Sequence, residues 1–174
     1  MRGSHARLNW ANVITSVRLV LALRLWVIGA GGGWMLVVVA TVAALLDLLD
    51  GPLARRLGRV TPFGARFDME TDAFLILTLS VLVWQMGHAG PWVLLSGLMR
   101  YAFVAASWLL PWLRAELPPT LRRQAVCVVQ VVTLIVSLAP LVTPPLSVAI
   151  SAAGLAALAW SFYLDVAWLA RRDL

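Results

Sequence analysis

Five of the eight acidic residues of this 174-residue chain lie between positions 47 and 72. Four of them are aspartates at a regular spacing, namely Asp47, Asp50, Asp68 and Asp72. On a helix, residues three or four positions apart share one face, so each of the two pairs presents its carboxylates in one direction. We expect two neighbouring helices, joined by a short loop, to bring the four carboxylates to one point.

Carboxylates that converge in this way need a cation, because a buried charge costs about 2.5–3.5 kcal/mol in a membrane helix and like charges repel. All-oxygen ligand sets favour hard divalent cations, so the predicted occupant is Mg²⁺ or Mn²⁺. On the same helix faces, Gly51, Ala54 and Gly64 would let a phosphorylated ligand approach the backbone, and Arg55 would donate to its phosphate oxygens. The alternative is that the aspartates are solvated helix ends and the small residues serve packing. The spacing as a whole favours metal-assisted phosphoryl chemistry.

The elements that must position these residues are strongly apolar. Hydrophobic residues make up 61% of the chain and charged residues 13%, with a mean hydropathy of +0.88. This excludes an ordinary water-soluble domain, which is about half apolar. The single cysteine excludes an intramolecular disulfide and a cysteine metal cluster. All fourteen basic residues are arginines, and most of them lie between apolar runs, which indicates lipid headgroups or a phosphate-bearing substrate as the anionic partner, and no nucleic acid.

Apolar runs long enough to approach a membrane span recur along the chain. They cover residues 13–30, 34–49, 73–86, 92–112, 125–141 and 146–169. The sequence therefore predicts an all-α polytopic membrane protein, with six transmembrane helices in a single domain over residues 1–174. The segment 47–72 is its catalytic motif. Within residues 1–6, the first five resemble an expression scar and not a part of the fold.

The segments between the runs differ in charge. Arginines follow the second, fourth and sixth runs and precede the first, whereas the other separators are rich in glycine or proline and nearly uncharged. By the positive-inside rule, both termini and the loop within 47–72 face the cytoplasm. Tryptophans at both predicted boundaries fit the aromatic belts of a membrane protein. We expect a multi-pass protein of the inner (cytoplasmic) membrane, with its active site on the cytoplasmic side.

The aspartate spacing resembles the signature of the CDP-alcohol phosphatidyltransferases. That signature is Asp, two residues, Asp-Gly, two residues, Ala-Arg, eight residues, Gly, three residues, Asp, three residues, Asp. All eight fixed positions are met here, by Asp47, Asp50, Gly51, Ala54, Arg55, Gly64, Asp68 and Asp72. The family also tends to carry Asn, Thr and Arg at the start of its first span. Asn12, Thr15 and Arg18 are similar to that feature, with Ala11 where a proline often stands.

The resemblance implies a membrane enzyme of phospholipid biosynthesis. In the family, an acceptor hydroxyl attacks the β-phosphorus of a CDP-linked lipid alcohol such as CDP-diacylglycerol, and CMP leaves. Position by position, Asp47, Asp50, Asp68 and Asp72 become the ligands of two divalent cations, and Asp72 becomes the general base. The resemblance also implies a CDP-binding set and a homodimer. The CDP-binding set is Gly51, Ala54, Arg55, Gly64, Asn12 and Thr15.

The acceptor is less defined by the sequence. Arg100, Arg114, Arg122 and Arg123 are candidates for binding an acceptor phosphate, although charged residues at helix ends more often determine topology. Arg100 lies inside an apolar run, so it should face the bundle interior and meet an acidic partner or an anionic ligand. Glu70 lies between two motif aspartates and should face solvent or an arginine. This surplus of arginine favours an anionic acceptor such as glycerol 3-phosphate or an inositol phosphate.

Two other classes of function compete with a transferase. A divalent-cation transporter or channel also places carboxylates inside a membrane bundle. However, such a pathway should have polar groups along its whole depth, whereas the aspartates here crowd one edge. A catalytically silent scaffold with a relic motif is the third possibility, and the intact set of aspartates argues against it.

Overall fold

The computed structural model describes residues 10–29, 33–56, 62–110 and 120–171, with side chains at 15–27, 33–46, 67–110 and 120–171. In this part of the chain all regular structure is helical, which confirms the all-α prediction. The elements are α1 (Trp10–Gly29), α2 (Trp34–Arg56), α3 (Pro62–Gln85), the short 3₁₀ helix η1 (Pro91–Leu94), α4 (Leu95–Leu109), α5 (Leu121–Ser137) and α6 (Leu146–Ala170).

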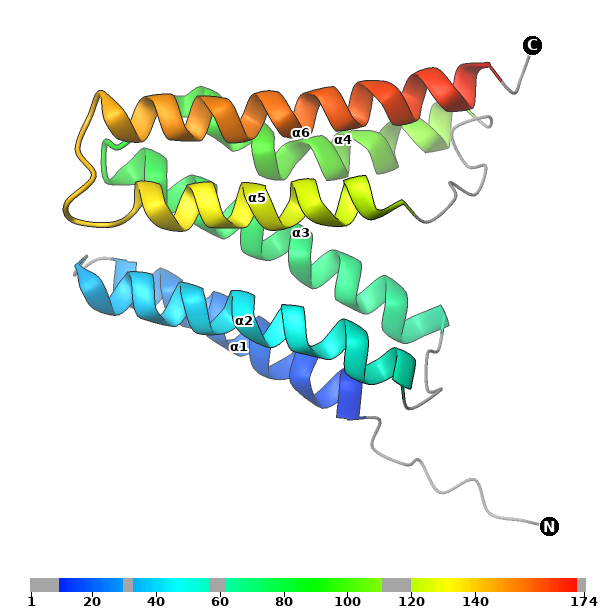
Figure 1. Ribbon diagram of the computed structural model, residues 1–174, viewed down its shortest axis with the longest axis horizontal. Helices are drawn as coiled ribbons and strands as arrows, with labels where there is room; N and C mark the ends of the chain where they lie inside the picture. Colours follow the sequence, from blue (N-terminus) through cyan, green and yellow to red (C-terminus); the bar gives the residue numbers. More distant parts are fainter. Residues whose placement is uncertain (1–9, 30–32, 57–61, 111–119, 172–174) are drawn as a thin grey trace.

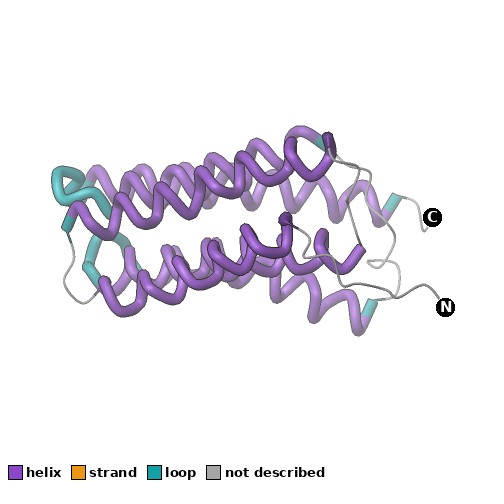
Figure 2. The backbone as a smooth tube through the Cα atoms, turned by 90° about the horizontal axis from the view of Figure 1, so that it is seen from below, coloured by secondary structure: helices purple, strands orange, loops and turns teal. Residues whose placement is uncertain are grey.

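The helices run side by side along one long axis and alternate in direction (Figure 1). The starts of α1, α3 and α5 and the ends of α2, α4 and α6 lie at one end of the bundle (Figure 1), and Figure 2 shows the same side-by-side arrangement of helices from below. Helix α3 is central, because it packs against α1, α4 and α5. Helices α1 and α2 pack together, as do α5 and α6. The motif halves therefore lie at the same end as the start of α1 and the end of α6.

Helices α2 and α3 continue well past the apolar runs from which they were predicted. Helix α2 ends at Arg56, beyond the run at 34–49, and α3 starts at Pro62, well before the run at 73–86. Proline is favoured at the first helical position, because its ring fixes a helical φ. An N–H at that position has no acceptor within the helix, so proline loses no hydrogen bond by lacking one. Both halves of the motif are therefore helical, as their spacing predicted.

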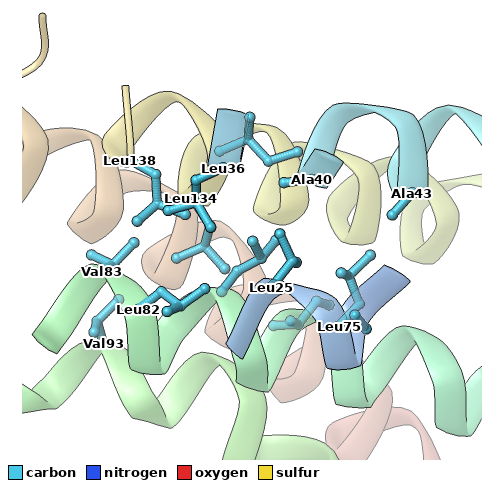
Figure 3. Packing of buried hydrophobic residues seen from close by; sticks show 14 of the residues in the cluster. Leu25, Leu36, Ala40, Ala43, Leu75, Leu82, Val83, Val93, Leu134 and Leu138 are labelled. Carbon is cyan, nitrogen blue, oxygen red and sulfur yellow. The ribbon is translucent and has the colours of Figure 1, made fainter. Parts of the chain in front are cut away.

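The core lies where α3 meets its neighbours. Leu25, Leu36, Leu82, Val83 and Leu134 pack there from four helices, and Figure 3 shows their side chains interlocked. Many large apolar side chains instead point outward, including Val27, Trp108, Leu109 and Trp160. An outward apolar surface of this extent suits a lipid environment better than water.

Two helical segments in the described part are long and apolar enough to cross a membrane, Pro91–Leu109 and Leu146–Ala170. A shorter apolar segment spans Trp34–Leu46. The described part of the chain is therefore a helical bundle with two candidate membrane spans. The six spans and the cytoplasmic termini stay predictions.

The end of the bundle opposite the motif is held by polar contacts between turns. His88, in the turn after α3, has its Nδ1 3.0 Å from the carbonyl oxygen of Val142, which precedes α6. Ser147 Oγ, at the start of α6, donates to the carbonyl oxygen of His88 at 2.6 Å. These contacts fasten the turn between α3 and η1 to the connection between α5 and α6.

Candidate active site

A single buried arginine of α1 joins two of the motif aspartates of α3. Arg18 Nη1 donates to Asp68 Oδ1 at 2.8 Å, and Arg18 Nη2 donates to Asp72 Oδ1. Asp68 and Asp72 are one helical turn apart, so their carboxylates lie on the same face of α3. The guanidinium group has a planar fork of donors, which lets one side chain reach two carboxylates at once.

The packing of α1 against α3 explains why these side chains meet. The two helices run in the same direction (Figure 1), and Trp26 Nε1 of α1 donates to Thr78 Oγ1 of α3 at 3.3 Å. Arg18 and Trp26 are therefore two contact points along one helix pair. At a rise of 1.5 Å per residue, Arg18 lies about 12 Å from the start of α1, and Asp68 and Asp72 lie about 9 and 15 Å from the start of α3.

Burial differs sharply across this cluster. The side chain of Arg18 is 1% exposed, whereas those of Asp68 and Asp72 are 41% and 33% exposed. The arginine thus binds the aspartates from the protein interior, and the aspartates remain partly accessible. The guanidinium carries one positive charge and contacts two negatively charged carboxylates, both of which are partly exposed.

The chemistry of this pair fits a hard divalent cation. Both side chains supply oxygen ligands one turn apart, and they already face a cation, the guanidinium of Arg18. Among the residues with described side chains, no group of three or more potential metal ligands is found. The side chains of Asp47 and Asp50 lie outside that part, although their backbone belongs to α2. The structure therefore shows half of the predicted ligand set, assembled on one helix face.

The predicted CDP-binding residues are described only in part. Thr15 is buried on α1, one turn before Arg18 and on the same side of the helix. The other members of the set have backbone in α1, α2 or α3, but their side chains lie outside the described residues; they are Asn12, Gly51, Ala54, Arg55 and Gly64.

The predicted acceptor arginines fall into two groups. Arg100 of α4 donates from Nη2 to Glu70 Oε1 of α3 at 3.0 Å, so each meets the kind of partner that was predicted for it. The predicted interior position of Arg100 is wrong, because its side chain is 34% exposed. Arg122 and Arg123, in the first turn of α5, both contact Asp165 near the end of α6.

The carboxylate of Asp165 is only 13% exposed. Arg122 Nη2 donates to its Oδ1, and Arg123 Nε lies 3.7 Å from its Oδ2. Arg123 Nε also donates to Thr120 Oγ1 at 3.1 Å. Two arginines thus meet one carboxylate where α5 starts and α6 ends, which is the motif end of the bundle (Figure 1). Arg114 lies outside the described residues.

Reasoning from the sequence did not predict the partner of Arg18 or the part played by Asp165. The sequence did indicate that Arg18 has a partner, because an arginine within a long apolar helix requires an acidic residue or a ligand. Asp165 carried a similar signal as an acidic residue within the last apolar run. The sequence does not determine how each helix is rotated about its own axis, and this rotation decides which acidic residue contacts which arginine.

Comparison with known proteins agrees with the motif. Residues 8–164 match the family model described as CDP-alcohol phosphatidyltransferase. A curated relative from Pseudomonas fluorescens, named CDP-diacylglycerol--glycerol-3-phosphate 3-phosphatidyltransferase, is 35% identical over 92 residues. The matched segment covers 51% of this chain and 47% of the relative, so the chain spans about half the length of that relative.

Proposed function

This chain belongs to the CDP-alcohol phosphatidyltransferase family, and we propose that it is a membrane enzyme that transfers a phosphatidyl group from CDP-diacylglycerol to glycerol 3-phosphate. The observation that carries the proposal is the complete eight-position motif, divided between α2 and α3, whose two described aspartates lie side by side against Arg18. Family membership favours this activity over cation transport.

In the proposed reaction, the acceptor hydroxyl oxygen forms a bond to the β-phosphorus of the CDP-alcohol. The bond between that phosphorus and the bridging diphosphate oxygen breaks, and CMP leaves with the electron pair. Asp72 accepts the proton of the attacking hydroxyl as general base. Its partly exposed carboxylate on α3 is open to a substrate, which this role requires.

The family is generally dependent on divalent metal, and we assign the ligands to Asp47, Asp50, Asp68 and Asp72. Two bound Mg²⁺ or Mn²⁺ ions would neutralise the diphosphate and stabilise the leaving CMP. We assign CDP binding to Gly51, Ala54, Arg55 and Gly64, together with Asn12 and Thr15 from α1. The glycines and Ala54 leave room beside the backbone, and Arg55 offers donors to phosphate oxygens.

The acceptor assignment has two supports. The curated relative is named for glycerol 3-phosphate, and Arg122 and Arg123 bring two guanidinium groups to the motif end of the bundle. A phosphate monoester dianion suits such a pair, because guanidinium groups bind phosphate oxygens through paired hydrogen bonds. We keep Arg100 and Arg114 as further candidates for the same contact and an inositol phosphate as the competing acceptor.

The proposed setting is the inner (cytoplasmic) membrane, with six spans, both termini and the active site on the cytoplasmic side, and a homodimer as in the family. The outward apolar side chains and the two candidate spans support the membrane location. The arginine-rich segments at the motif end support its orientation.

The test is CMP release by the purified protein in detergent micelles containing CDP-diacylglycerol. We expect release only when Mg²⁺ or Mn²⁺ and glycerol 3-phosphate are both present, with the phosphatidyl product identified by mass spectrometry. Parallel reactions with myo-inositol 1-phosphate and serine assign the acceptor. If CMP is released with either of these compounds and not with glycerol 3-phosphate, the assignment of glycerol 3-phosphate as the acceptor is wrong. No release with any hydroxyl acceptor overturns the transferase itself.

A further inference from the structure

Arg18 has no part in the catalytic scheme above, yet it is one of the most deeply buried side chains in the described part of the chain. Its guanidinium cannot lose its charge at physiological pH, so burying it requires a permanent negative partner. The structure places two such partners against it, Asp68 and Asp72. Both belong to the proposed metal and base set.

From this geometry we infer that Arg18 is a positioning residue for the proposed transferase, holding Asp68 and Asp72 as a pair from the buried side. The inference rests on the proposed function, because it concerns how that site is prepared for its cations. The paired hydrogen bonds go to Oδ1 of each carboxylate. Each carboxylate has a second oxygen, and both side chains are partly exposed.

The pair needs such a partner because two carboxylates one turn apart on a helix repel each other. Without a cation, each side chain would turn away from the other and lose the geometry that a divalent cation and a general base require. A lysine at this position would supply the charge but not the planar fork that reaches both carboxylates. Arg18 therefore contributes both charge and geometry, and these two contributions can be separated by mutation.

The charge is tested with Arg18→Met, which keeps a long apolar stem. In EDTA, we expect its melting temperature in detergent to fall by about 5 °C or more below that of the unmutated protein. Saturating Mn²⁺ should then raise the melting temperature of the variant more than that of the unmutated protein, because the ion relieves the repulsion as well. Arg24→Met is the matched control, since Arg24 is an exposed arginine on the same helix. Its response to Mn²⁺ should equal that of the unmutated protein.

A double mutant separates electrostatic pairing from simple packing. If Arg18 holds two repelling carboxylates, then Arg18→Met combined with Asp68→Asn should melt at a higher temperature in EDTA than Arg18→Met alone, since one of the repelling charges is gone. A packing role predicts the opposite, because the two losses would then add. A double mutant that melts at or below the Arg18→Met temperature overturns the inference.

The geometry is tested with Arg18→Lys, which also covers the case in which Arg18→Met does not fold. We expect Arg18→Lys to fold and to bind Mn²⁺, as followed by electron paramagnetic resonance, while its kcat for CMP release falls by about 10-fold or more. An unchanged kcat, or an equal Mn²⁺ response in Arg18→Met and the unmutated protein, contradicts the inference. Either result leaves the proposed function intact as long as the unmutated protein releases CMP. Failure of this inference and failure of the proposed function can therefore be distinguished.

Discussion

Arg122 at the start of α5 and Asp165 near the end of α6 form an ion pair that joins the two helices at the motif end of the bundle. The pair allows two interpretations, a structural link between helices or a carboxylate that holds an acceptor-binding arginine. The two differ in what each mutation should do to the Michaelis constant for the acceptor.

If Arg122 binds the acceptor phosphate, Arg122→Gln removes a charged hydrogen bond worth about 1.5–3 kcal/mol. The KM for glycerol 3-phosphate should then rise by about 10-fold or more, with the KM for CDP-diacylglycerol unchanged. Asp165→Asn should raise the acceptor KM less, because both arginines keep their charge. Steady-state CMP release at varied acceptor concentration measures both constants.

The control for this pair is Arg171→Gln, which removes an exposed arginine just beyond the end of α6. Its acceptor KM should match that of the unmutated protein. Equal stability losses in Arg122→Gln and Asp165→Asn, with no change in either KM, would show that the ion pair is purely structural.

Asp72 and Glu70 are two residues apart on α3 and differ in environment. Asp72 contacts buried Arg18, whereas Glu70 is exposed and contacts Arg100. Because general base catalysis contributes about 10²–10⁴-fold, Asp72→Asn should lower kcat for CMP release by at least about 100-fold. Nucleotide binding, measured by equilibrium dialysis with labelled CMP and Mn²⁺, should be largely retained.

Glu70→Gln is the matched carboxylate-to-amide control on the same helix, and its kcat should stay within about 2-fold of the unmutated protein. Asp72→Asn with near-normal turnover would remove Asp72 from the role of base. The same result would also remove Asp72 from the metal ligands, and the metal assignment would then rest on Asp47, Asp50 and Asp68.

The helical bundle and the placement of the motif on two helices were predictable from the sequence, because long apolar runs and i, i+3 and i+4 spacing both depend on helix geometry. The ends of the helices were less predictable from the sequence. Hydropathy begins the third span at residue 73, yet α3 begins at Pro62, because polar residues extend a helix beyond its apolar part. Hydropathy also does not determine helix rotation, so neither Arg18 beside Asp68 nor Arg122 beside Asp165 could be read from it.

The proposed six-span topology can be tested with single cysteines in a Cys127→Ala background, since the native cysteine is exposed. The connection between α5 and α6, which contains Leu141, and the end of α6, which precedes Arg171, lie at opposite ends of the bundle (Figure 1). In intact cells, a membrane-impermeant maleimide should label Leu141→Cys and not Arg171→Cys. Permeabilised cells should show labelling of both. Labelling of Arg171→Cys in intact cells would place the end of α6 outside and contradict the positive-inside assignment.

Gly97 of α4 lies directly against the backbone of α3. A Cβ at this position would stand 2.5 Å from Leu77 Cα, so the two helices would have to separate. Overpacking of this kind costs about 1–3 kcal/mol, and the higher helix propensity of alanine returns at most about 1 kcal/mol. Gly97→Ala should therefore lower the melting temperature in detergent, whereas Ala102→Ser, on the exposed side of the same helix, should leave it nearly unchanged. Because α3 carries Asp68 and Asp72, Gly97→Ala should also reduce CMP release at temperatures where the protein is still folded. A melting temperature at or above that of the unmutated protein would mean that α3 and α4 do not pack this closely.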